Sequence, residues 1–273
     1  MHGKIDLNPS GPGVPPRSAR RPRRSARIDV LYEDADLVAA NVPPGLAEEP
    51  GWMQPASGGE PHSGAGDASP PTPVSLWPTD AEISGLMVWT RNDAARQRLG
   101  EQFADRRLSC VYLAVVRATV LDDSGVIDQP ILDPGETSLR VRLDARRGRP
   151  AMTEWRLRDR FVSFALLECT PRTRVRHQVR AHLEAAGLPL AVDPRYGGAE
   201  SLMLSSFKAG YRRSRRRPER PLIRRPTLHA WRISFEQPMS GRPLQFEVAP
   251  PKDLRATLHQ LDRFGRIPKA GAP

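Results

Sequence analysis

Three side chains that can hold an anion, Arg176, His177 and Arg180, stand close together in the segment TRVRHQVRAHLEAAGLPL, residues 173–190. An arginine beside an apolar stripe needs a partner, because removing an unpaired charge from water is very costly. A carboxylate or a phosphate satisfies a guanidinium through charge-assisted hydrogen bonds. Asp80, far earlier in the sequence, is the strongest candidate for the carboxylate.

The element that must position these side chains is predicted to be one amphipathic helix that begins at Thr173. A threonine is a suitable N-cap, because its hydroxyl accepts from a backbone N–H of the first turn. Gly187 is a natural stop. Between them, one stripe at helical spacing is apolar, made of Val175, Val179, Leu183 and Ala186.

The charge of the chain indicates a polyanionic partner. The 273 residues carry a formal net charge of +11, and such an excess of cation points to nucleic acid. Six arginines lie between Arg17 and Arg27, and nine lysines and arginines lie between Lys208 and Arg225, opposed only by Glu219. A genome biased toward arginine explains part of the charge, but it does not explain this clustering.

The two cysteines, Cys110 and Cys169, are too few for a disulfide framework or a four-cysteine zinc site. Both stand in apolar, strand-like runs, which predicts buried free thiols. No apolar run reaches the roughly 18 residues of a membrane helix, and the N-terminus lacks the hydrophobic stretch of a secretory signal. We therefore expect a protein of the reducing cytoplasm.

Composition divides the chain into one expected domain and several irregular segments. Residues 1–27 are rich in Pro and Arg without apolar periodicity, which predicts a disordered basic tail. This tail either grips phosphates or is a solvated segment without a role. We expect the domain at 28–262, with a long loop at 47–74 and a basic insertion at 203–226, and then a loose C-terminal tail at 263–273.

Strands outnumber helices in the expected domain. Runs rich in β-branched and aromatic residues predict strands near residues 28–32, 37–41, 84–90, 110–117, 148–160, 161–169, 228–236 and 244–251, the last two as an antiparallel hairpin around a turn at Ser240 and Gly241. Single helices are expected from Asn92 or Asp93 to about Ala104 and from Lys252 to about Leu261, with a turn at 122–125. This pattern favours an α+β domain on a mixed, largely antiparallel sheet flanked by helices and loops.

Several of these pieces resemble, in order, motifs of the RNA pseudouridine synthases of the RluA type. The resemblance covers about residues 28–261 and rests on LYEDADLVAANVPPGL, WPTDAEISGL, CVYLAVV, GRPAMTEW, TRVRHQVRAHL, LPLAVDPRYGG and the C-terminal strands. It implies that fold, with a central RNA-binding cleft, and isomerisation of uridine to pseudouridine in ribosomal or transfer RNA. The implied reaction needs no metal or organic cofactor. We expect a monomer, because a lone basic domain can envelop an RNA stem-loop by itself, and we predict neither a membrane nor a protein partner.

The resemblance also assigns roles to residues. The family's catalytic aspartate, stacking tyrosine and salt-bridging arginine fall on Asp80, Tyr112 and Arg180. A closed pocket needs an ionised carboxylate held by an arginine and an aromatic face for the flipped base. Tyr112 is also a candidate base for the C5 proton. Cations and one aromatic are expected to contact RNA: Trp77, Arg174, Arg176, His177, Lys208, Arg212, Arg213, Arg215, Arg216 and Arg217.

The sequence departs from the family pattern around the expected site. Pro78 stands where the family has an arginine next to the catalytic aspartate, and the neighbouring Trp77 is a candidate wedge in its place. Further departures are Val42, Thr79, Ala81, Glu82, Ile83, Cys110 and Val175. An RNA-binding relative with weak or lost catalysis, for example in ribosome assembly, is therefore the alternative function.

Each candidate also has a purely structural interpretation. Asp80 alone resembles a turn or cap residue, Tyr112 a core residue of a strand, and Arg180 a surface arginine with a buried stem. His177 and His182 have a spacing that is poor for a metal. A DNA-binding protein is a third, weaker possibility, since the sequence has no helix-turn-helix or zinc signature. The order of the motifs is what favours the catalytic interpretation.

Overall fold

The computed structural model describes residues 28–46, 74–76, 80–118, 122–135, 138–212 and 217–267. The predicted tail at 1–27 and nearly all of the loop at 47–74 lie outside these residues, as do Trp77, Pro78 and Thr79. Three α-helices occur in the described part: α1 (Asp93–Ala104), α2 (Gln178–Ala185) and α3 (Lys252–Gly265), with a short 3₁₀ turn at Leu204–Ser206.

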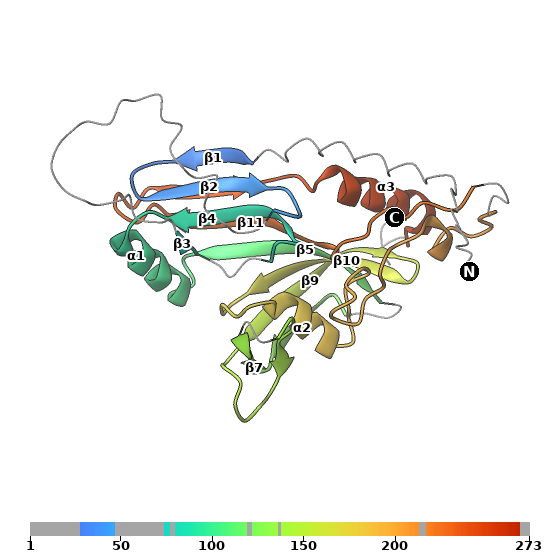
Figure 1. Cartoon of the computed structure of the whole chain (residues 1–273), viewed down its shortest axis with the longest axis horizontal. Helices are drawn as coiled ribbons and strands as arrows, with labels where there is room; N and C mark the ends of the chain where they lie inside the picture. Colours follow the sequence, from blue (N-terminus) through green and yellow to red (C-terminus); the bar gives the residue numbers. More distant parts are fainter. Residues whose placement is uncertain are drawn as a thin grey trace, which may run out of the picture.

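One large mixed sheet forms the centre of the molecule (Figure 1). Its strands follow the order β1-β2-β4-β11-β5-β10-β9-β6, with β12 beside β11 and β3 beside β4. They are β1 (Asp29–Glu33), β2 (Leu37–Val42), β3 (Val74–Ser75), β4 (Ser84–Thr90), β5 (Ser109–Arg117), β6 (Ser124–Asp128), β9 (Met152–Phe161), β10 (Phe164–Pro171), β11 (Leu228–Glu236) and β12 (Pro243–Glu247). A two-stranded sheet, β7 (Ile131–Leu132) and β8 (Arg142–Leu143), lies below α2 in Figure 1.

The expected α+β architecture is confirmed. Within the described strands, only β4 and β11 pair in parallel, and the other pairs are antiparallel. The hairpin of β11 and β12 turns at Ser240 and Gly241 as the sequence predicts. The short strands β3, β7 and β8 were not predicted, because two residues are too few to display a period.

Successive side chains of β5 pack into two different cores, one on each face of the sheet. Ala114 and Val116 pack in the core cluster that contains the apolar side chains of α2. Leu113 and Val115 pack in the cluster that contains those of α3. Because successive side chains of a strand point to opposite faces, α2 and α3 cover opposite faces of the sheet.

The helix α1 covers the same face as α2, but farther along the sheet. Its residue Leu99 packs in a cluster with Cys110, which lies on the face of β5 that Ala114 and Val116 also share. Tyr112 packs against both the α1 cluster and the α2 cluster. The fold therefore places this tyrosine at the seam between two cores on one face of the sheet.

Several predicted boundaries differ from the structure, including two strand ends, because β9 begins at Met152 and not at residue 148, and β12 ends at Glu247 and not at residue 251. The α2 helix begins at Gln178, after His177, and not at Thr173, whose hydroxyl instead accepts from the N–H of Met152 at 2.9 Å and donates to the side chain of Gln178 at 2.9 Å. Ala186 is consequently the exposed C-cap and not part of a buried stripe. The predicted stop at Gly187 is confirmed by its left-handed φ of +74°.

The end of α3 and the turn at 122–125 also differ from the prediction, because tertiary packing that cannot be inferred from the sequence shifts both boundaries. The α3 helix continues past the predicted end at Leu261 to Gly265, so residues 263–265 are not a loose tail. The predicted turn at 122–125 contains the start of β6, in which Gly125 is paired with Trp155. A Cβ on Gly125 would lie 2.7 Å from the Trp155 ring, so this glycine makes room for an aromatic side chain inside a strand.

Two compositional expectations can be compared with the structure. Cys110 and Cys169 are buried free thiols, as predicted, and burial raises the pKa of the Cys110 thiol to about 12. No helix in the described part of the chain is long and apolar enough to span a membrane.

Gly85 is required where β4 meets β11. Its φ is +120°, and a Cβ at this position would lie 2.1 Å from the carbonyl oxygen of Ala230, its partner in the parallel pair. Beside it, the buried Ser84 hydroxyl lies 3.0 Å from Nδ1 of His229, whose Nε2 lies 3.0 Å from the carbonyl oxygen of Val248. This close approach of two backbones fixes the start of β4.

We predict that Gly85→Ala lowers the free energy of unfolding by roughly 2–6 kcal/mol, because it adds backbone strain to a steric overlap. Gly241→Ala is the matched control, since Gly241 also has a positive φ, +70°, but has open space around it. It should cost only about 1–2 kcal/mol. Urea unfolding of both variants measures the difference, and equal losses would contradict the role given to the β4–β11 contact.

Candidate active site

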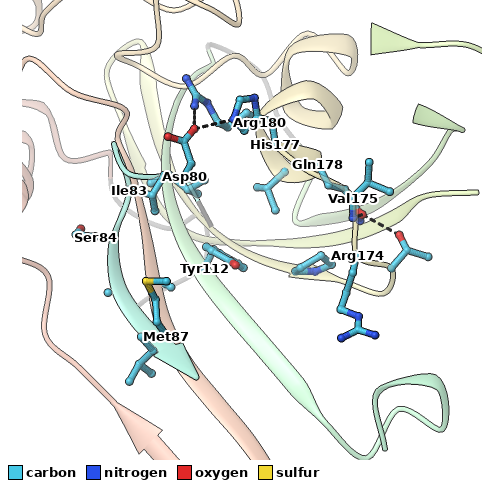
Figure 2. A pocket seen from close by; sticks show the side chains of 17 residues that line it. Asp80, Ile83, Ser84, Met87, Tyr112, Arg174, Val175, His177, Gln178 and Arg180 are labelled. Atoms are coloured by element: carbon cyan, nitrogen blue, oxygen red, sulfur yellow. Dashed lines mark hydrogen bonds and ion pairs between the residues drawn. The ribbon is translucent and has the colours of Figure 1, made fainter. Parts of the chain in front are cut away.

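A pocket opens on the face of the sheet that α1 and α2 cover (Figure 2). The start of β4, Tyr112 of β5, the segment from Pro171 to Arg180 and two residues of β11 line it. Asp80, Arg180 and His177 gather at one end of the pocket in Figure 2, and Met87 and Arg174 lie toward the other. The structure thus brings together the three residues that the sequence analysis expects to carry out catalysis, Asp80, Tyr112 and Arg180.

Asp80 is held by a tight turn that precedes β4. Its Oδ1 accepts from the N–H of Glu82 at 3.0 Å, and its carbonyl oxygen accepts from the N–H of Ile83 at 2.8 Å. The turn is anchored to the end of β2, because the N–H of Gly45 donates to the carbonyl oxygen of Ala81 at 2.7 Å. Asp80 is therefore a turn residue and a pocket residue at once, and its side chain is only 7% exposed.

Arg180 joins Asp80 to a second aspartate. Its Nε and one terminal nitrogen donate to the two oxygens of Asp193, at 2.7 and 2.6 Å, in a bidentate pair. The other terminal nitrogen donates to Oδ2 of Asp80 and lies 3.4 Å from the carboxylate of Glu82. The Arg180 side chain is 1% exposed and that of Asp193 is fully buried, so each charge depends on the others for its compensation.

The surroundings of Asp80 keep its carboxyl group ionised. Burial alone would raise its pKa, but the hydrogen bond from His177, the charge of Arg180 and the N–H of Glu82 outweigh that effect. The pKa of Asp80 is therefore held well below its usual range. A buried carboxylate that stays charged is available as a nucleophile or a base at neutral pH.

Tyr112 presents a neutral phenol to the pocket. Burial raises its pKa well above the ordinary value, and Cys110, two residues earlier on the same face of β5, raises it further. A phenol that remains protonated is a poor general base at neutral pH. The flat ring on the pocket wall is the feature that this residue offers to a planar ligand.

His177 links Asp80 to a tyrosine that the sequence analysis did not select. Its Nε2 lies 3.1 Å from Oδ2 of Asp80, and its Nδ1 lies 2.9 Å from the hydroxyl of Tyr196. That hydroxyl accepts from the buried N–H of Val141 at 2.9 Å. His177 has a left-handed backbone, with φ +54° and ψ +18°, immediately before α2. Its side chain is only 7% exposed, which leaves little surface for the RNA contact expected from the sequence.

The two neighbouring arginines have different surroundings. Arg176 donates to both oxygens of Asp133 and to the carbonyl oxygens of Gly135 and Ser138, so it holds the loop between β7 and β8. Arg174 donates to the carbonyl oxygen of Leu76 at 3.0 Å and stacks over the ring of Phe103 at 5.1 Å. No carboxylate among the described residues pairs with Arg174, and burial lowers its pKa.

Arg174 also lines a groove that continues from the pocket. Thr173, Arg174 and Val175 border both hollows. Ser75, Leu76, Phe103, Ala104, Arg149, Pro150 and Arg172 complete the groove, whose described lining contains three arginines and no acid.

The predicted contacts of the basic insertion that the structure describes, Lys208, Arg212 and Arg217, do not line the pocket. Lys208 stacks over the ring of Phe264 of α3 at 4.3 Å, while Arg212 and Arg217 are exposed. Arg213, Arg215 and Arg216 lie outside the described residues, as does Trp77.

Sequence reasoning missed Asp193 and Tyr196, and it did not connect His177 with Asp80. Both missed residues belong to LPLAVDPRYGG, a motif that contributes to the family resemblance but predicts no role for either residue. The available signal was an acid and an aromatic in a turn-rich segment directly after the arginine-bearing helix. Within the described residues, no group of three or more His, Cys, Asp or Glu side chains is arranged to hold a metal ion.

The amino-acid sequence of this chain is similar to those of known proteins. Residues 75–185 match the family model described as RNA pseudouridylate synthase. Ribosomal large subunit pseudouridine synthase D of Xanthomonas campestris is 32% identical over 86% of this chain and 69% of its own length. An RNA pseudouridine synthase of Bacillus subtilis, described as uncharacterized, is 28% identical over 87% of this chain and 74% of that protein.

Other relatives are longer than this chain. The chain covers 61% of the length of ribosomal large subunit pseudouridine synthase D of Neisseria meningitidis, at 30% identity. Among solved structures, human RNA pseudouridylate synthase domain containing 1 superposes with a TM-score of 0.58 over 85% of this chain and 87% of that one. At 18% identity, this likeness supports the fold alone.

We predict that Asp80→Asn destabilises the protein by roughly 1–3 kcal/mol at pH 7, because charge-assisted hydrogen bonds are lost. The folded pKa of Asp80 is lowered, so its contribution is complete above the unfolded pKa of about 3.9 and fades as the pH falls below that value. Urea unfolding at pH 7, 5 and 3.5 should show the gap between wild type and variant narrowing only at the lowest pH. A gap that stays constant would contradict the ionised state.

Proposed function

The chain belongs to the family of RNA pseudouridine synthases, and on this basis we propose that it isomerises uridine to pseudouridine in ribosomal RNA, with Asp80 as the catalytic carboxylate. The observation that carries the proposal is the buried pair of Asp80 and Arg180 in a pocket that Tyr112 also lines. Relatives named for the large ribosomal subunit favour ribosomal RNA over transfer RNA as the substrate. We further propose that the catalytic domain extends from residue 28 to the end of α3 at Gly265.

The reaction needs an ionised oxygen next to the sugar. The carboxylate of Asp80 either bonds to C1′ or removes a proton from the ribose, and the electron pair of the N-glycosidic bond passes to N1 of uracil. The released base rotates within the pocket and C5 bonds to C1′, while the carboxylate either leaves C1′ or, in the second route, returns its proton to the ribose. The C5 proton is then lost and N1 gains one, so that the product is an isomer of the substrate.

The hydrogen bonds of Asp80 indicate which oxygen reacts. Oδ2 accepts from both Arg180 and His177, whereas Oδ1 accepts only from the N–H of Glu82 among the described residues. An oxygen that accepts from a guanidinium and an imidazole is a weaker nucleophile than one that accepts from a single backbone N–H. We assign the attack to Oδ1, with Oδ2 as the anchored end of the carboxylate.

The remaining groups of the pocket bind the target nucleotide. A uridine in RNA has to leave its stack before an enzyme can reach C1′, and an aromatic face can receive the base. Tyr112 supplies that face as a neutral phenol. Met87 and Ile83 line the same pocket and add apolar surface.

The cationic groove supplies a path for the RNA backbone away from the pocket. Arg174 stands where the pocket and the groove meet, and its charge has no carboxylate partner in the described structure. A half-buried guanidinium of this kind is best satisfied by a phosphate. We assign Arg174 and Arg149 to the phosphates that flank the target uridine, and Arg176 to holding the β7–β8 loop.

The alternative function is that of an RNA-binding relative without catalytic activity. The departures from the family motif at Cys110 and Val175 are the reason for this alternative. The bonds that hold Asp80 do not involve the side chain of either residue. The intact Asp80–Arg180–Asp193 group therefore favours the enzyme.

We predict that Asp80→Asn reduces turnover at least about 1000-fold, because the nucleophile is removed while the shape of the side chain is kept. The measurement is tritium release from RNA that contains C5-tritiated uridine. Affinity for the same RNA should change by less than about threefold, because the pocket and the groove are preserved. A wild-type protein that binds the RNA but releases no tritium would support the non-catalytic alternative.

We predict that Arg174→Ala lowers the salt dependence of RNA binding by about 0.7 in the slope of log K against log salt, as expected for one lost phosphate contact to a single strand. Arg174→Lys should retain most of this slope, because it keeps the charge. Arg255→Ala is the control, since Arg255 is exposed on α3, which covers the other face of the sheet. An unchanged slope for Arg174→Ala would contradict the assignment of the groove.

A further inference from the structure

Asp80 has a second buried side-chain donor besides Arg180, and we propose that this donor, His177, is a positioning residue for the isomerisation. Its Nε2–H holds Oδ2 of Asp80, and Tyr196 fixes the imidazole ring from the other side. The inference rests on the proposed function, because the group being positioned is the carboxylate that attacks the sugar. It adds to that function a chain of three side chains leading from the β7–β8 loop to the reacting group.

In the neutral form of the imidazole, the hydrogen bonds determine which ring nitrogen carries the proton. The oxygen of Tyr196 accepts from the N–H of Val141 at 2.9 Å, so its own O–H is free to donate to Nδ1 of His177, also at 2.9 Å. Burial raises the pKa of Tyr196, which keeps that phenol protonated. With Nδ1 acting as an acceptor, the ring proton lies on Nε2 and points at Asp80.

The opposite tautomer would leave a repulsive contact. A lone pair on Nε2 would then face Oδ2 of Asp80 across 3.1 Å, between two side chains that are each 7% exposed. Water cannot relieve such a contact, and an unpaired acceptor in this position is costly. Tyr196 thus selects the form of His177 that can hold the carboxylate.

His177 also has an unusual backbone conformation, which a histidine can adopt and which suits this role. Its left-handed conformation, with φ +54°, precedes α2 without a capping hydrogen bond from the side chain. Histidine, asparagine and aspartate are the residues other than glycine that adopt this conformation most readily. The ring stands edge-on to Tyr196 at 5.6 Å and 87°, so it is packed and not free to turn toward RNA.

Two substitutions of His177 distinguish a positioning role from a purely structural role. The amide of His177→Asn reaches the place of Nδ1, so this variant keeps the Tyr196 contact and tolerates the left-handed backbone, but it cannot reach Asp80. The amide of His177→Gln reaches the place of Nε2 and can donate to Asp80, although glutamine tolerates this backbone less well. Positioning predicts that His177→Gln has the higher kcat, whereas a merely structural role predicts that the more stable His177→Asn does.

The experiment measures kcat and KM by tritium release and Tm by circular dichroism for wild type and both variants. We expect His177→Asn to lose about 10- to 100-fold in kcat, as for a lost hydrogen bond to a charged group, with little change in KM. His177→Gln should recover most of kcat despite a lower Tm. Equal kcat values in the two variants, or a kcat that follows Tm, would overturn the proposal.

A second measurement does not depend on activity. Nitrogen-15 NMR of the histidine rings at neutral pH should show His177 protonated at Nε2 in the wild type, and Tyr196→Phe should weaken that preference. If the proton resides on Nδ1 in the folded wild type, the proposal is wrong even when the enzyme is active. If the wild type releases no tritium, the proposed function fails, and the ring proton still tests the contact with Asp80.

Discussion

The buried charge of Arg180 constrains the rest of this structure. Its guanidinium is 1% exposed and bonds to Asp193 on one side and Asp80 on the other. A buried arginine is tolerated only when its charge and its donors are satisfied together. Three segments far apart in sequence must therefore meet in register: the turn before β4, the helix α2, and the loop that contains Asp193. The site is built by the same bonds that compensate the charge.

The arrangement of the sheet explains why the Asp80–Arg180–Asp193 group lies beside a pocket that can hold a ligand. Because α1 and α2 cover the same face but separate cores, Tyr112 falls at the seam between them. Gly85 lets β4 and β11 approach closely under the pocket. The Asp80 carboxylate therefore lies just before β4, whose position against β11 is fixed by their close contact. The ring of Tyr112, at the seam between the two cores, lines the pocket in which a ligand can bind.

Much of the fold follows from the sequence, and part of the site does as well. Runs rich in β-branched and aromatic residues predicted the long strands, including those of the β11–β12 hairpin. The predicted start of α1 at Asn92 or Asp93 agrees with the structure, in which Asn92 accepts from the N–H of Ala95. Asp80, Tyr112 and Arg180 could be selected together because the order of motifs resembled a family. The early start given to α2 was wrong, because Thr173 binds a neighbouring strand instead of capping a helix. Asp193 could not be identified, since its pairing with Arg180 depends on a loop path that no spacing encodes.

The proposed chemistry requires the carboxylate of Asp80 to face the sugar of a uridine whose base lies on Tyr112. A crystal structure of the Asp80→Asn protein bound to its target RNA shows whether it does. We expect the uracil ring to stack on Tyr112, and the terminal side-chain atom that takes the place of Oδ1 to lie roughly 3–3.5 Å from C1′, as in a near-attack arrangement. A uridine bound elsewhere, or one whose sugar faces away from residue 80, would contradict it.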